Sequence, residues 1–181
     1  MGMQKRLILN PGLLEITIDR LCQQLIENHQ NFENTVFLGL QPRGIFLAEL
    51  IHQSIFNNFG ITLPLGYLDT TFYRDDFRRR ELPKAANETK IDFIIEDKRV
   101  VLIDDVLFTG RSVRAAMDAI LAYGRPNKVE LLVLVNRKYS RDLPIEPDYV
   151  GRNVNTIASQ KVSVEWEGNG AKQNSVYLIN V

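Results

Sequence analysis

The stretch Arg99-Val-Val-Leu-Ile-Asp104-Asp105-Val-Leu-Phe108-Thr109-Gly110-Arg111-Ser112-Val113 decides how this chain folds. Its β-branched and aliphatic residues at 100–103 predict a buried strand, which ends in two adjacent carboxylates. A turn with a hydroxyl group and a glycine follows, and a helical apolar pattern begins after it. Backbone N–H groups at such a turn, next to a helix N-terminus, bind anions. The stretch therefore predicts a phosphate site.

Asp104 and Asp105 stand beside that predicted phosphate site. A carboxylate next to a phosphate is unfavourable unless it binds a cation or accepts hydrogen bonds from sugar hydroxyls. The expected ligand therefore carries a phosphate and a ribose diol, together with Mg²⁺. The alternative is an ordinary strand-to-helix connection with an acidic end. The sequence contains neither the Walker A phosphate-loop pattern nor the dinucleotide-binding fingerprint, and Gly110 is the only glycine in its turn.

Length and composition predict one α/β domain over residues 1–181, with a core of ordinary size. Lys plus Arg equals Asp plus Glu at 22 each, which argues against a general polyanion binder. Apolar runs are too short to cross a membrane, and no signal-peptide pattern opens the sequence. The single cysteine, Cys22, excludes an internal disulfide and fits a reducing compartment. We expect a cytoplasmic protein.

Helical and extended patterns alternate along the chain. Apolar stripes predict helices over 13–29, from Ile45 to Ile55, and from Val113 to a stop at Gly124. Apolar runs predict strands over 35–40, 61–68, 100–103 and 129–135. This alternation predicts a mostly parallel central sheet flanked by helices. The segments 162–166 and 175–179 predict a C-terminal hairpin appended to that sheet.

The charged segment from about 74 to 90 fits neither pattern, and it contains several arginines with Pro83 among them. A connection of this length is unusual in a compact domain unless it is functional or disordered. It is either a solvated surface loop or a flexible lid whose arginines face a polyanionic substrate.

The quoted stretch resembles the phosphoribosyl-pyrophosphate motif of type I phosphoribosyltransferases, and within them that of the pyrimidine-operon regulator type. Further matches extend the resemblance over nearly the whole chain: Gln41-Pro-Arg-Gly-Ile45, Thr71-Phe-Tyr-Arg-Asp-Asp76, Tyr123-Gly-Arg-Pro126, Leu143-Pro-Ile145 and Asp148-Tyr-Val-Gly-Arg-Asn153. The resemblance implies the type I phosphoribosyltransferase fold. It also implies a uracil phosphoribosyltransferase that forms uridine 5′-phosphate and pyrophosphate from uracil and phosphoribosyl pyrophosphate.

That reaction assigns a role to the acidic pair and to the turn that follows it. The 5′-phosphate is expected on the N–H groups and hydroxyls of the turn, at a helix N-terminus, where Gly110 permits close approach. The turn residues concerned are Phe108, Thr109, Gly110, Arg111 and Ser112. Asp104 and Asp105 are expected to accept from ribose hydroxyls, directly or through Mg²⁺, which keeps its waters and needs few protein ligands.

Two other segments are expected to contact the substrate: the turn at 40–44 is expected to bind pyrophosphate, and Arg74 is a candidate for lid contacts. Arg43 and Gly44 lie in the turn that resembles the pyrophosphate loop, although a Pro-Arg-Gly turn before a helix also has purely structural uses. Arg74 is preferred to the arginines at 78–80, because the resembled segment carries an arginine there. Together with Asp104 and Asp105, Arg74 forms the predicted catalytic set.

The base is expected at the end of the strand over 129–135. By similarity, Arg137 faces an exocyclic carbonyl of uracil, and backbone groups near Val162 complete the pocket; the alternative for Arg137 is a surface arginine. Purine-type relatives carry a carboxylate where this chain has Phe108. A phenyl ring is no general base, so a pyrimidine is favoured, and a purine phosphoribosyltransferase is the alternative.

The resemblance also implies a regulator that binds pyrimidine-gene leader mRNA when uridine nucleotides are bound, through a basic face of a homodimer or higher homo-oligomer. Arg141 and Arg152 agree with the basic positions of the family. Gln23, Gln41, Pro42 and Glu146 depart from them, and Glu146 would repel phosphates. An RNA-binding or nucleotide-sensing regulator with little catalysis therefore stays an alternative to the enzyme.

Overall fold

The computed structural model describes residues 5–75 and 86–180. Strands and helices alternate through the middle of the chain, as the sequence predicts. The elements in order are β1 (Lys5–Leu9), α1 (Pro11–His29), β2 (Thr35–Leu40), α2 (Gly44–Phe59), β3 (Leu65–Leu68), η1 (Thr71–Tyr73), β4 (Arg99–Leu107), α3 (Arg111–Ile120), β5 (Lys128–Lys138), β6 (Tyr149–Asn155), β7 (Gln160–Glu165), η3 (Glu167–Asn169) and β8 (Ser175–Asn180).

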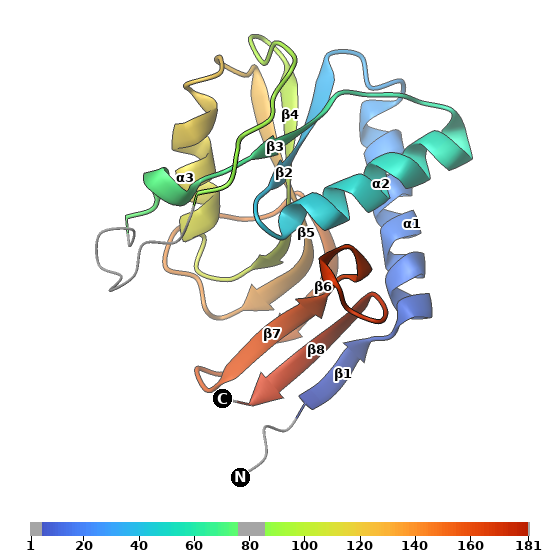
Figure 1. Cartoon of the computed structure of the whole chain (residues 1–181), viewed down its shortest axis with the longest axis vertical. Helices are drawn as coiled ribbons and strands as arrows, with labels where there is room; N and C mark the ends of the chain where they lie inside the picture. The colour runs from blue at the N-terminus through green and yellow to red at the C-terminus, as the bar shows by residue number, and fades with distance from the viewer. Residues whose placement is uncertain (1–4, 76–85, 181) are drawn as a thin grey trace.

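Five of the described strands form the central sheet, in the order β3-β2-β4-β5-β6. All neighbouring pairs in it are parallel. Helices α1 and α2 lie on one side of this sheet and α3 lies on the other (Figure 1). The predicted α/β architecture is confirmed. The strand expected over 61–68 is shorter than predicted and begins at Leu65.

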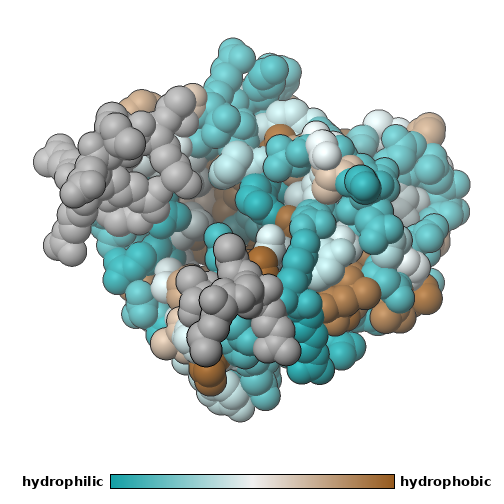
Figure 2. All heavy atoms as spheres, turned by 60° about the horizontal axis from the view of Figure 1, so that its bottom comes forward, coloured by the Kyte–Doolittle hydropathy of each residue, from teal (hydrophilic) through white to brown (hydrophobic). Residues whose placement is uncertain are grey.

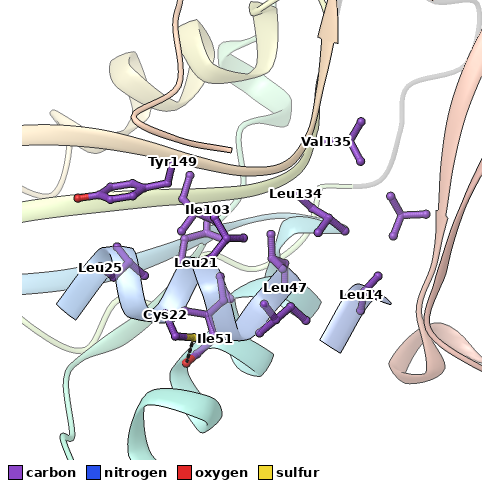
Figure 3. Packing of buried hydrophobic residues seen from close by; sticks show 14 of the residues in the cluster. Leu14, Leu21, Cys22, Leu25, Leu47, Ile51, Ile103, Leu134, Val135 and Tyr149 are labelled. Atoms are coloured by element: carbon purple, nitrogen blue, oxygen red, sulfur yellow. Dashed lines mark hydrogen bonds between the residues drawn. The ribbon is translucent and has the colours of Figure 1, made fainter. Parts of the chain in front are cut away.

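Apolar residues fill both faces of the central sheet because side chains alternate along each strand. On β4, Val101 and Ile103 face the cluster that contains α1 and α2, while Val100 and Leu102 face α3. Figure 3 shows Leu21 of α1 and Ile51 of α2 in the first cluster, beside Ile103. Each such burial contributes about 1.5–3 kcal/mol. The run at 100–103 is wholly apolar because both of its faces are covered.

A second, antiparallel sheet has the order β1-β8-β7. The predicted C-terminal hairpin forms from β7 and β8, but it does not extend the parallel sheet. Instead, β1 pairs with β8, and the three strands lie together at one end of the molecule (Figure 1). Strands β1 and β6 escaped the sequence analysis because the apolar run of β1 is only three residues long, and β6 has polar residues in place of an apolar run. Figure 2 shows that the face at this end is mostly hydrophilic.

The strand order places the chain's direction change between β2 and β4, since β3 lies beyond β2 while β5 and β6 lie beyond β4. In open parallel sheets, ligands bind at the carboxyl ends of the strands at such a switch point. The turns at 41–43 and 108–110 leave β2 and β4 at that edge.

None of the helices in the described ranges has the length and apolar character needed to span a membrane.

Candidate functional site

The acidic pair lies at the carboxyl end of β4, where three parts of the chain meet. Asp105 Oδ2 accepts a hydrogen bond of 2.9 Å from Arg43 Nε, in the turn between β2 and α2. The same guanidinium donates through a second nitrogen to the carbonyl oxygen of Val164 in β7. The fold therefore brings the predicted ribose or metal ligand next to the predicted pyrophosphate residue, at the edge of the second sheet.

Gly44 lets the N-terminus of α2 approach the acidic pair. A Cβ at this position would lie 2.5 Å from the carbonyl oxygen of Ile103 and 2.9 Å from the Cα of Asp104, which leaves no room for a side chain. Packing therefore also explains why position 44 is a glycine, because only glycine lets α2 begin directly against β4.

The carboxyl group of Asp104 is withdrawn from water although the residue keeps some exposure. This burial, reinforced by the charge of neighbouring Asp105, raises the pKa of Asp104 well above its usual range. Asp104 Oδ1 accepts a 2.9 Å hydrogen bond from the backbone N–H of Asp105, which opposes the rise only in part. A nearby cation would relieve this repulsion, as would hydroxyl donors.

The turn after β4 has the geometry of an anion site. Gly110 takes a φ of +92° and α3 begins directly after it. Neither α2 nor α3 has a side-chain N-cap, whereas the side chain of Asn10 caps α1. After Arg111, the first amides of α3, those of Ser112 and Val113, are therefore available to an external acceptor. A cavity of about 120 Å³ lies here, lined by Arg74, Asp104, Val106, Leu107, Phe108, Thr109, Gly110, Ser112 and Val113.

Two arginines near this cavity differ in what they contact. Arg74 donates a 2.6 Å hydrogen bond to Ser112 Oγ. It therefore lies beside the turn at 108–112, which is predicted to bind the 5′-phosphate and is called the phosphate turn below. The guanidinium of Arg111 is paired with Asp75 and with Asp142, and its backbone N–H donates a hydrogen bond of 3.4 Å to Thr109 Oγ1. The arginines at 78–80 and most of the predicted lid, at 76–85, lie outside the described residues.

Arg137 and Phe108 form the other side of the site. The guanidinium carbon of Arg137 lies 3.8 Å from the centre of the Phe108 ring, a cation–π contact. Arg137 is only 6% exposed, which argues against a surface arginine, and burial lowers its pKa. Its Nε donates to Thr156 Oγ1 at 3.1 Å, and one terminal nitrogen donates to the carbonyl of Gln160 at 2.9 Å.

The outer edge of β7 joins Arg137 to Arg43. The carbonyls of Gln160 and Val164 point away from β8 toward these two arginines. Backbone groups in an antiparallel strand alternate sides with a period of two. The N–H and C=O of Val162 therefore face the same edge, between the two arginines. Its side chain is buried in the core, so any contact with a ligand comes from its backbone.

The donor set fits Mg²⁺. The described residues hold no group of three or more His, Cys, Asp and Glu side chains that would enclose a metal ion. Two adjacent carboxylates, one with a raised pKa, suit a hard cation that takes its other ligands from water and substrate oxygens. Asp104 and Asp105 would hold it, directly or through water or ribose.

Comparison with known protein families shows which family contains this chain. The model of the phosphoribosyl transferase domain matches residues 7–168. This chain belongs to the phosphoribosyltransferase family. Relatives named bifunctional protein PyrR include those of Acetivibrio thermocellus, 44% identical over 87% of this chain and 85% of the relative, and of Caldicellulosiruptor bescii, 43% identical over 87% and 86%. The chain is a phosphoribosyltransferase of the PyrR type.

Solved phosphoribosyltransferases share the fold. The hypoxanthine phosphoribosyltransferase of Trypanosoma cruzi has a TM-score of 0.73 at 11% identity, covering 97% of this chain and 96% of that one. That of Staphylococcus aureus has a TM-score of 0.71 at 18% identity, covering 94% and 90%.

Sequence reasoning missed one part of this phosphoribosyltransferase site. Arg141, expected on an RNA-binding face, lies behind the phosphate turn and donates to the carbonyl of Phe108. It also donates a 2.6 Å hydrogen bond to Asn136 Oδ1, at the end of β5. A polar residue directly after a wholly apolar run was the available signal for Asn136. Arg152, by contrast, is exposed on the edge strand β6.

Proposed function

We propose that this phosphoribosyltransferase transfers the phosphoribosyl group from phosphoribosyl pyrophosphate to uracil, and that Mg²⁺ assists. The observation that supports the proposal is the position of Asp104 and Asp105 between two segments whose N–H groups and cationic side chain suit anions. The turn at 108–112 lies on one side, and Arg43 with the N-terminus of α2 lies on the other. Phosphoribosyl pyrophosphate likewise has its ribose diol between a phosphate and a pyrophosphate.

The reaction breaks the bond between C1 of the ribose and pyrophosphate, and forms a bond from C1 to N1 of uracil, which gives up its N1 proton to solvent. In the transition state C1 carries positive character and the leaving group gains negative charge. The turn at 108–112 holds the 5′-phosphate, and Asp104 and Asp105 accept from the ribose hydroxyls, which fixes C1. Arg43 donates to the departing pyrophosphate. When bound, Mg²⁺ supplies further positive charge for the pyrophosphate oxygens.

Uracil recognition rests on Arg137 and the outer edge of β7. The buried guanidinium offers a donor for a uracil carbonyl, and the backbone of Val162 offers one donor and one acceptor. Phe108 is 44% exposed and supplies an apolar wall instead of a base for a purine nitrogen. These features favour uracil over guanine and hypoxanthine.

A base-specificity assay tests this proposal. The protein is incubated with labelled phosphoribosyl pyrophosphate, Mg²⁺ and each of the five common nucleobases in turn. We expect release of pyrophosphate that depends on uracil and yields uridine 5′-phosphate. A preference for guanine or hypoxanthine would refute the pyrimidine assignment, and no turnover with any base would favour a sensor without catalysis.

We also propose a regulatory role, in which uridine nucleotides favour binding of a pyrimidine-gene leader RNA by a homodimer or larger homo-oligomer. The exposure of Arg152 on edge strand β6 supports this role. Binding of a leader hairpin is measured with and without uridine 5′-phosphate for the wild type, Arg152→Gln and the exposed control Arg125→Gln. We expect the nucleotide to strengthen binding and only Arg152→Gln to weaken it. Equal binding by all three proteins would remove Arg152 from the interface.

A further inference from the structure

We infer that Arg141 is a positioning residue that orients the phosphate turn, an inference that rests on the proposed function of that turn. The segment 141–145 packs against the back of the turn at three successive residues, Phe108, Thr109 and Gly110. It leaves the front of the turn, which lines the cavity of about 120 Å³, uncovered. The role we assign to Arg141 is therefore internal to the enzyme and needs no RNA.

The contacts to the turn are made to its carbonyl groups. Arg141 donates to the carbonyl of Phe108, and the backbone N–H groups of Asp142 and Leu143 donate to the carbonyl of Thr109 at 3.0 Å and 3.1 Å. The side chain of Ile145 covers Gly110, since a Cβ there would lie 3.2 Å from Ile145 Cδ1. Both carbonyls that precede Gly110 are thus fixed from behind.

Fixing these carbonyls also fixes the N–H groups. In a trans peptide the C=O of one residue and the N–H of the next point in opposite directions. The N–H groups of Thr109 and Gly110 therefore point away from the segment 141–145. Within the described part of the chain neither is the donor of a recorded hydrogen bond. They are two donors held ready for an oxyanion.

The geometry favours an arginine over a lysine at position 141. Its terminal nitrogens reach two acceptors at once, the carbonyl of Phe108 and Asn136 Oδ1. Asn136 is held in turn by a 3.0 Å hydrogen bond from its Nδ2 to Asn153 Oδ1 on β6. The planar fork of a guanidinium can bridge two fixed acceptors, whereas a lysine ammonium is a single point on a flexible stem. Asn153 and Asn136 thereby anchor Arg141, which anchors the turn.

The test separates phosphate binding from folding and from RNA binding. Arg141→Gln, Arg141→Lys and Asn136→Leu are compared with the exposed control Arg125→Gln. The affinity for ribose 5-phosphate is measured by calorimetry, and the KM for phosphoribosyl pyrophosphate and for uracil by initial rates. Arg141→Gln is expected to weaken ribose 5-phosphate binding and to raise the KM for phosphoribosyl pyrophosphate by about tenfold or more, while the KM for uracil stays within about twofold. Arg141→Lys and Asn136→Leu should show smaller shifts of the same kind.

Each outcome decides the inference. If folded Arg141→Gln binds ribose 5-phosphate as the wild type does, the inference is overturned, and a loss restricted to RNA binding would return Arg141 to the RNA face. Should Arg141→Gln fail to fold, Arg141→Lys and Asn136→Leu decide by the same two measurements. Wild type that binds ribose 5-phosphate but shows no turnover would refute the proposed activity and leave the positioning role standing. Wild type that does not bind it would overturn both.

Discussion

Arg43 Nε lies 2.9 Å from Asp105 Oδ2, so the residue expected to receive pyrophosphate is paired with a residue expected to hold ribose or metal. The pair spans the switch point of the sheet, from the turn after β2 to the end of β4. A substrate that brings its own anion and diol replaces both partners together, because pyrophosphate takes the guanidinium and ribose hydroxyls or Mg²⁺ take the carboxylate. We therefore expect that binding at one half of the site frees the side chain that the other half uses.

Asp105→Asn should lower turnover by about tenfold or more and leave the fold intact. The amide keeps the size of the side chain but removes the negative charge that serves the ribose, the metal and the electron-poor C1. Initial rates with uracil and phosphoribosyl pyrophosphate measure the effect, and thermal unfolding checks the fold. The control is Asp118→Asn, on the exposed side of α3. Turnover equal to the wild type would rule out the ribose and metal role.

Gly110→Ala should weaken phosphate binding because of backbone strain, not because a side chain would enter the cavity. Gly110 has a φ of +92°, and its added Cβ would press on Ile145 behind the turn. Gly60→Ala is the matched control, since Gly60 has a φ of +67° with nothing within 4 Å of its Cβ position. Both variants should lose about 1–2 kcal/mol of unfolding free energy. A rise in KM for phosphoribosyl pyrophosphate is expected for Gly110→Ala alone, and its absence would remove the turn from the phosphate site.

Phe108→Asp tests base choice. The new carboxylate would lie beside the Arg137 guanidinium, now 3.8 Å from the ring, and would compete with uracil for its donors. We expect kcat/KM for uracil to fall by about tenfold or more. Phe56→Asp is the control, because Phe56 is 49% exposed against 44% for Phe108 and lies on α2. If Phe108→Asp kept the full uracil activity, Arg137 would have no part in base recognition.

The central sheet could be predicted from the sequence because its signals are local. The run at 100–103 is apolar on both faces, and Gly110 marks the start of α3 with a φ that other residues rarely adopt. The acidic pair and the turn after it could be singled out for the same reason, since both lie at a strand end, whereas Arg43 was singled out by the resemblance of its turn to the pyrophosphate loop of the family. Each of these features depends only on residues that are close together in the sequence, so one sequence is enough to find it.

Long-range partners could not be predicted in the same way. Arg141 and Phe108 are 33 residues apart, and Arg43 and Val164 are 121 residues apart. No periodicity records such a contact, so the prediction for Arg141 rests on the basic positions of the resembled family. The pairing of β1 with β8 joins the two ends of the described chain, and it changed where the C-terminal hairpin lies. A basic residue that packs inside the chain looks the same in the sequence as one that faces a nucleic acid.

Asp104→Asn should stabilise the fold at neutral pH while lowering turnover. Burial and the neighbouring charge of Asp105 raise the pKa of Asp104 in the folded state. A carboxyl whose pKa is raised on folding contributes most to stability below its unfolded pKa of about 3.9, and that contribution is lost as the pH rises through the folded pKa. The wild type therefore bears a penalty at neutral pH that the uncharged amide avoids. In Mg²⁺-free buffer the variant should melt a few degrees higher than the wild type near pH 7, and this difference should shrink as the pH falls toward 4. A variant that melts lower than the wild type at pH 7 would show that the Asp104 charge is satisfied within the fold, and that the site holds no stored repulsion for a cation or a ribose to relieve.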